Sequence, residues 1–385
     1  MLDAEAALTG AEKAVGTNVD RSVDWVRALR LLVSSADVEG GLTPAGRSQL
    51  AAKIELLAGE RLRAEQILSA EPGIARRPLA VRFAVAGMGR SGTTLLHRLL
   101  SCDPDVEFLA TWQAMHPVPA HPRPSEGEDP RRRQTREWVE GLARTSPETL
   151  RIHPIQADAP EEEVFLLQHS FASMLFALSS PLPSYSQWLN GTDHTGAYRF
   201  ALDLVRLNEW AAGTDAGRPR IMKSPQFLLD LDVVLREMPD ALVVQTHRDP
   251  LDLVGSYCST YAASRRRAIE SLDPVALGAE RLDNLELMAR RGMAVRERWD
   301  PARFCDVRYA DLVADPLGTV ERIYRTAGLT VSGAARQSMS AWLSANPQHG
   351  SGRHDYSLAD YGLDRTMVLE RFGDYMERYG LSVER

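Results

Sequence analysis

The sequence is poor in cysteine and in long apolar runs, and both shortages limit what the protein can be. Its three cysteines are odd in number and lack metal-type spacing, so we expect neither a disulfide framework nor a CxxC metal site. Nowhere do about 18 apolar residues follow one another. The N-terminus carries early acids instead of the apolar core of a signal peptide. These absences favour a soluble, cytoplasmic protein without stable membrane insertion.

Lysine is also scarce. Lys13, Lys53 and Lys223 account for three of the 45 basic residues, so arginine supplies all the others. Any anion site in this protein will therefore be built largely from arginine. The formal net charge of −7 argues against nucleic acid or an anionic membrane as a general partner, although a local basic pocket for a small anion stays compatible with it.

The chain has 385 residues, 44% of them hydrophobic, which is enough for one large α/β domain with an appendage. Residues 1–75 have mostly helical spacing of apolar residues and predict an N-terminal helical region, and 76–385 form the main domain. In that domain short apolar runs alternate with helical patterns, which predicts a P-loop-like, three-layer α/β/α fold around a mostly parallel sheet. The expected strands are 81–87, 219–224, 241–249 and 303–309.

Two other segments carry local predictions. Residues 116–136 are rich in proline and charge, which predicts a long loop or cover. From Glu161 onward, acids followed by a broad apolar face predict one helix as far as residue 178, with Pro160 just before it.

The stretch AVAGMGRSGTT resembles a nucleotide-binding P-loop that has lost its lysine. Gly87 and Gly92 have the P-loop spacing, but Thr93 takes the lysine position. A glycine-rich turn between a strand and a helix exposes successive backbone N–H groups, here from Gly89 to Thr94. The hydroxyls of Ser91, Thr93 and Thr94 add further donors. The loop therefore predicts an anion site, although a tight turn alone also requires glycine.

Two motifs together carry a family resemblance. GRSGTT, followed far downstream by THRDPLDLVGSYCS, resembles the PAPS-dependent sulfotransferases, and PRIMKSP and YSLADYGL are similar to a bacterial and actinobacterial branch of them. The resemblance spans roughly residues 80–380. It implies that the loop binds the 5′-phosphosulfate of 3′-phosphoadenosine 5′-phosphosulfate (PAPS), with Arg90 where the family usually has lysine. It also implies that Arg248 and Ser256, eight positions apart, bind the 3′-phosphate.

More site residues follow from the same resemblance. Tyr309 in VRYADLVADP corresponds to a tyrosine near the adenine, and Arg353 belongs to a loop that closes over the 3′-phosphate. Lys223, after the strand-like run PRIM, is a second candidate catalytic cation, although a surface or structural ion pair is an equal alternative. No cluster of ligands has metal spacing, so we predict no metal.

The acceptor hydroxyl needs a base, and the sequence leaves several choices. Ala110 and Gln113 stand where related sequences often carry acids. DAPEEEVF resembles a motif of the bacterial branch, so among the remaining carboxylates we select Glu162 as the base, with Glu161 and Glu163 close behind; all three lie at a predicted helix start. That position also suits the helix dipole without any catalytic role. Glu107 and the histidines at positions 97, 116, 153 and 169 stay open as candidates.

Apolar and aromatic residues in 164–178 and 181–190 suggest a hydrophobic or lipidic alcohol as acceptor, although most of them also suit a core. The predicted function is sulfuryl transfer to such an acceptor. Two more functions stay open: a nucleotide kinase or NTPase, and a catalytically inactive nucleotide-binding interaction protein. The sequence does not decide whether copies of the chain assemble.

Overall fold

The computed structural model describes residues 1–119, 128–145, 155–347 and 357–381. Its centre is a four-stranded sheet of order β2-β1-β3-β4 in which every neighbouring pair is parallel. The predicted parallel α/β fold is therefore confirmed, and the strands are β1 (Ala80–Gly87), β2 (Pro219–Lys223), β3 (Leu242–His247) and β4 (Phe304–Arg308). Because all four run the same way, their carboxyl ends meet at one edge of the sheet.

Helices cover both faces of the sheet, as the near-continuous apolar composition of the strands requires. On one face Ala84, Met222 and Val243 pack against α11 (Thr195–Ala211) and α12 (Leu231–Glu237). On the opposite face Val85 and Val244 pack against a second group of helices. That group consists of α4 (Thr93–Leu100), α16 (Pro316–Thr326) and α17 (Gly333–Ala345).

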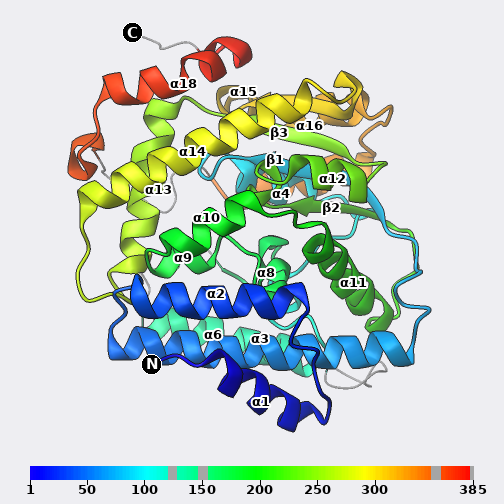
Figure 1. Cartoon of the computed structure of the whole chain (residues 1–385). Coiled ribbons are helices and arrows are strands. Elements are labelled where there is room, and N and C mark those ends of the chain that lie inside the picture. The colour runs from blue at the N-terminus through cyan, green and yellow to red at the C-terminus, as the bar shows by residue number, and fades with distance from the viewer. Residues whose placement is uncertain (120–127, 146–154, 348–356, 382–385) are drawn as a thin grey trace.

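A third apolar cluster lies beyond these layers, where long helices cross one another. It is formed by α13 (Pro250–Arg265), α14 (Pro274–Arg296), η4 (Leu358–Tyr361) and α18 (Arg365–Tyr379). Figure 1 shows α14 and α18 at the top of the molecule and the N-terminal helices at the bottom. The short helices η2 (Pro225–Leu228), η3 (Pro301–Arg303) and α15 (Tyr309–Ala314) flank strands of the sheet.

The N-terminal region is helical, as predicted, with α1 (Ala4–Val15), α2 (Asp24–Val38) and α3 (Pro44–Ala70). Its apolar faces pack against side chains of residues 164–189 in one continuous cluster. The partners include α8 (Val164–Leu167), α9 (Phe176–Ser179) and α10 (Pro183–Gly191). The N-terminal helices and this segment of the main domain therefore bury each other's apolar surface.

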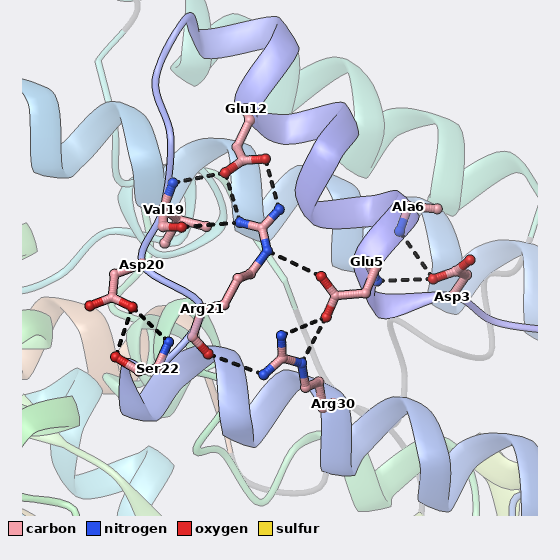
Figure 2. Close-up of polar contacts among 9 residues, drawn as sticks. All are labelled: Asp3, Glu5, Ala6, Glu12, Val19, Asp20, Arg21, Ser22 and Arg30. Carbon is pink, nitrogen blue, oxygen red and sulfur yellow. Dashed lines mark hydrogen bonds and ion pairs between the residues drawn. The ribbon is translucent and has the colours of Figure 1, made fainter.

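Ion pairs tie α1 to α2 at the surface (Figure 2). The Arg21 guanidinium donates to both oxygens of Glu12, at 2.7 and 2.8 Å, and to Glu5 at 3.1 Å. Arg30 of α2 donates to the second oxygen of Glu5. The hydrogen bonds from Arg21 and from the Val19 amide lower the pKa of Glu12 to about 2. Such exposed pairs fix the geometry of the turn more than they stabilise the fold.

Two sequence-based predictions need correction. The predicted loop 116–136 is wrong at its end, because helix α6 (Pro130–Thr145) begins at Pro130; residues 120–127 lie outside the described part. The predicted single helix from Glu161 is also wrong. Only α8 and the 3₁₀ turn η1 (Gln168–Ser170) form before Phe171 adopts a positive φ of 51°.

Tertiary hydrogen bonds explain the break at Phe171. The Tyr185 hydroxyl donates to the Phe171 carbonyl at 2.9 Å and accepts from the Ser173 amide at 3.1 Å. The Gln226 side chain accepts from the Met174 amide and donates to the Ala172 carbonyl. These partners satisfy the backbone groups that a continuous helix would have paired, which local sequence patterns do not reveal.

None of the helices that the structure describes has both the length and the apolar composition needed to cross a bilayer.

Candidate functional site

The glycine loop connects β1 to α4 at the carboxyl edge of the sheet. Arg90 has φ 72° and Gly92 has φ 95°, so both adopt the left-handed region that L-residues avoid. A Cβ atom on Gly92 would lie 2.7 Å from Tyr309, and one on Gly89 would lie 2.7 Å from Tyr257. The loop is therefore held between two tyrosine rings, and glycine is required at both points by close approach.

Ser91 faces the protein interior and not the open side of the loop. It is fully buried, and its hydroxyl donates to the Met88 carbonyl at 2.6 Å and contacts Thr246 Oγ1 at 2.6 Å. Its amide also bonds to the Met88 carbonyl. Ser91 thus fastens the loop to β3, and the start of α4 at Thr93 and Thr94 carries the N–H groups that helix termini leave for external partners.

Four residues that the sequence placed in one binding site come together in the fold. Arg90 Nε donates to Ser256 Oγ at 3.0 Å, and Arg248 Nη1 donates to the Arg90 carbonyl at 3.1 Å. The Arg248 guanidinium stacks over the Tyr309 ring at 4.5 Å. Among the described residues, the buried Nε of Arg248 has no hydrogen-bond partner. Two guanidinium groups next to a glycine loop suit phosphate or sulfate oxygens.

Arg248 directly follows the last residue of β3, and side chains from neighbouring elements fix the position of that residue. His247, the last residue of β3, is fully buried, with Nδ1 2.9 Å from the Tyr375 hydroxyl and Nε2 2.8 Å from Asp306. Its ring stacks on Tyr379 at 3.8 Å. Burial lowers the pKa of His247 against the opposing effect of Asp306. Helix α18 therefore supports the position from which Arg248 extends.

The two remaining catalytic candidates, Lys223 and Glu162, form an ion pair although they are 61 residues apart in the sequence. The Lys223 side chain is 2% exposed and that of Glu162 is 17% exposed. Lys223 ends β2, which pairs with β1 directly beside the glycine loop. His97 of α4 lies buried nearby: desolvation, with Lys223 and Arg98 as further causes, holds its pKa well below the usual value.

The neighbouring carboxylates have different roles. Glu163 Oε2 accepts from the Lys223 amide at 2.6 Å, and burial raises the pKa of Glu163 to about 8. Glu161 is buried and accepts from the Glu162 amide at 3.0 Å. Glu107 pairs with Arg218 at 2.8 Å, at the opposite end of β2 from Lys223. The carboxylate of Glu162 is the one that pairs with the Lys223 ammonium.

Two of the candidate histidines lie against α3. His169 and His116 both face the buried carboxylate of Glu60, at 2.8 and 3.6 Å. Gln113 accepts from the Ala110 amide at 2.9 Å and so stabilises the start of α5 (Thr111–Met115). Two predicted site residues, Arg353 and His153, lie outside the described part of the chain.

Sequence reasoning missed Tyr257, which packs against Gly89, and Thr246, which contacts Ser91. Tyr257 follows Ser256 directly within the second motif, and this adjacency is the one signal that could have pointed to it. In the part of the chain that the structure describes, no three histidine, cysteine, aspartate or glutamate residues gather as a metal site would require.

Comparisons with known proteins agree on one family. The model of the sulfotransferase family matches residues 83–333. Sulfotransferase STF1 from Mycobacterium tuberculosis has a TM-score of 0.82 and 33% identity, covering 96% of this chain and 98% of that one. Sulfotransferase STF9 from Mycobacterium avium has a TM-score of 0.90 with 24% identity, covering 100% and 98%, and supports the fold.

A curated relative is similar over a shorter stretch. Omega-hydroxy-beta-dihydromenaquinone-9 sulfotransferase Stf3 of Mycobacterium bovis is 27% identical over 164 residues. That stretch covers 42% of this chain and 40% of the relative, so the match spans less than half the length of either protein.

Proposed function

The chain belongs to the sulfotransferase family and is a sulfotransferase enzyme, and from this premise we propose that it transfers a sulfuryl group from PAPS to a hydroxyl of a hydrophobic or lipidic alcohol. The second product is 3′-phosphoadenosine 5′-phosphate (PAP). PAPS is the donor that the family uses. No metal takes part in this proposal.

The observation that carries the proposal is the convergence of Arg90, Arg248, Ser256 and Tyr309 at the glycine loop. A donor with two separate anionic ends needs two anion sites on one surface. The loop N–H groups and Arg90 fit the 5′-phosphosulfate, and Arg248 with Ser256 fits the 3′-phosphate. The Nε atom of Arg248 is buried and has no hydrogen-bond partner among the described residues, and a phosphate oxygen would satisfy this donor.

In the proposed reaction the sulfuryl group leaves the 5′-phosphate oxygen and bonds to the acceptor oxygen, while the acceptor proton passes to Glu162. In this proposal Arg90 and Lys223 stabilise the negative charge that develops on the departing phosphate. Such transfers depend mostly on positioning and charge stabilisation. We further assign Gly89, Gly92, Thr93 and Thr94 to the donor cradle; Ser91 supports that cradle from inside. Tyr309 is assigned to the adenine side, and Arg353 to closure over the 3′-phosphate.

The Lys223–Glu162 ion pair supports Glu162 as the base. It brings the acid that would accept a proton next to the cation that would contact the donor. A carboxylate so placed would take up the acceptor proton close to the site where phosphate charge develops. The name of the relative Stf3 gives a menaquinone derivative as its substrate, which supports a lipidic acceptor for this chain. We do not propose that this chain uses the same acceptor.

Calorimetric titration with PAP, ADP and ATP, each with and without Mg²⁺, tests the donor half of the proposal. We expect tight PAP binding that is independent of Mg²⁺ and much weaker ADP binding. A preference for ATP with Mg²⁺ would instead favour a nucleotide kinase. Transfer of label from ³⁵S-PAPS to a panel of long-chain and polyprenyl alcohols then tests the acceptor half. PAP binding without transfer to any alcohol would favour the inactive binding protein.

A further inference from the structure

Glu163 lies next to the proposed base but points in another direction. It is buried, and its Oε2 accepts the Lys223 backbone N–H at 2.6 Å. Lys223 Nζ pairs with Glu162 instead. Glu163 therefore holds the end of β2 through the Lys223 backbone, and the neighbouring glutamate holds the ammonium of the same lysine.

Glu163 lines an internal cavity of about 10 Å³, which is room for about one water molecule. Tyr198 from α11 lines the same cavity. Glu163 Oε1 and the Tyr198 hydroxyl are both buried without a hydrogen-bond partner among the described residues. The rest of the lining is apolar and comes from α8, α11, β2, η2 and Met238. Leaving two buried polar atoms unpaired is costly, and a water molecule beside Glu163 and Tyr198 would pair with both.

The charges around Glu163 come from several elements. Lys223 and Arg220 of β2 favour its ionised form, but Arg220 is already paired with Glu209 of α11 at 2.8 Å, and Lys223 with Glu162. The Asp230 carboxylate lies near Tyr198 and is itself paired with His194 at 2.9 Å. Lys223 and Arg220 are thus each paired with another carboxylate, and desolvation is the largest influence on the pKa of Glu163.

We propose that Glu163 is a neutral carboxylic acid that donates its O–H to a water shared with Tyr198 and thereby acts as a positioning residue for the Lys223–Glu162 pair. This rests on the proposed function, because the pair matters only if Lys223 contacts the donor. Ionised Glu163 would add a second negative charge beside the Lys223–Glu162 pair and attract the Lys223 ammonium away from the donor site.

Infrared spectroscopy of the whole protein tests the protonation state without any ligand. The wild type should show a carbonyl stretch of a buried neutral carboxylic acid at pH 7, and this band should be absent in Glu163→Gln. Tyr198→Phe should retain the band at a changed frequency, because one partner of the water is lost. The exposed Glu55→Gln is the matched control and should leave the band unchanged. Absence of the band in the wild type would contradict the proposal that Glu163 is a neutral carboxylic acid.

Calorimetric titration with PAP between pH 6.5 and pH 9.5 tests the positioning role. Wild-type affinity should fall several-fold as the pH rises past about 8, the value to which burial raises the pKa of Glu163. Glu163→Gln, which mimics the neutral acid, should bind PAP as the wild type does at pH 7 and lose this alkaline decline. Glu163→Ala should bind more weakly throughout.

Equal losses in Glu163→Gln and Glu163→Ala would overturn the positioning role, since an amide should replace a neutral acid but not a carboxylate. An alkaline decline that persists in Glu163→Gln would also overturn it. If the wild type binds no PAP at all, the proposed function fails and the positioning role with it, whereas the infrared band still decides whether Glu163 is neutral.

Discussion

Arg90 donates from Nε to the hydroxyl of Ser256, 3.0 Å away and 166 residues later in the chain. This bond joins the crown of the glycine loop to the second turn of α13. Because Arg248 donates to the Arg90 carbonyl as well, Arg90 of one proposed anion site contacts both residues of the other. Loss of Arg90 should therefore disturb both ends of the donor.

Replacement of Arg248 by alanine should weaken PAP binding by roughly 1.5–3 kcal/mol, the scale of a hydrogen bond to a charged group. Binding of ADP, which lacks the 3′-phosphate, should change much less. Calorimetry with both ligands makes the comparison. Arg199→Ala is the control, because Arg199 is exposed and pairs with Glu237 at the surface. Unchanged PAP affinity in folded Arg248→Ala protein would remove this arginine from the site.

Glu162→Gln should leave PAP affinity nearly intact and lower the transfer rate by roughly 10²- to 10⁴-fold, the usual contribution of a general base. Single-turnover transfer of label from PAPS, with the best alcohol of the panel, measures this. The matched control is Glu107→Gln, whose carboxylate pairs with Arg218 at the far end of β2. Full transfer by Glu162→Gln would assign the base to another residue.

Gly92→Ala should weaken PAP binding by at least about tenfold, equivalent to ~1.4 kcal/mol. The substituted residue would have to keep φ 95° and place its Cβ 2.7 Å from the Tyr309 ring. The loop can relieve this only by moving. Gly10→Ala in α1 is the control, because nothing lies within 4 Å of its Cβ position. Wild-type affinity in Gly92→Ala would mean that the loop tolerates a different shape.

The stability of the protein should depend on pH through Glu163. Its pKa rises from 4.5 to about 8 in the folded state. Its neutral form therefore contributes fully to the free energy of unfolding below about pH 4.5, and this contribution is lost as the pH rises to 8. Relative to the wild type, Glu163→Gln should therefore gain stability over that interval, on the order of 2–4 kcal/mol. Urea unfolding at pH 5 and pH 8 measures the difference, and Glu55→Gln should follow the wild type. Parallel curves for Glu163→Gln and the wild type would contradict the raised pKa.

The sequence predicted the elements whose signals are local or repeated. Short apolar runs gave all four strands, and the glycine spacing located the loop at the carboxyl end of β1. Ser256 could be assigned to the same site as Arg248 because helix α13 directly follows β3. The resemblance to a family supplied the roles of these residues, which spacing alone would not have done.

Features that depend on distant partners escaped prediction. The break at Phe171 depends on Tyr185 and Gln226, whose hydrogen bonds are visible only in the fold. Glu162 and Glu163 were equivalent in the sequence, and they separate only because β2 places the Lys223 ammonium against one and the Lys223 amide against its neighbour. The sequence predicted that the Ser91 hydroxyl is a donor to the anion, but in the fold this hydroxyl contacts Thr246 in the protein interior.

The core shared by the N-terminal helices and residues 164–189 has a consequence for the order of synthesis. Helices α1 to α3 leave the ribosome before residues 164–189, so the apolar surface that they pack against this segment, such as the Trp25 ring against Phe171, stays uncovered until that segment has been made. At ordinary translation speeds this delay is on the order of ten seconds. During that time the nascent chain exposes apolar surface, so its yield in a cell should depend on chaperones that bind helices α1 to α3.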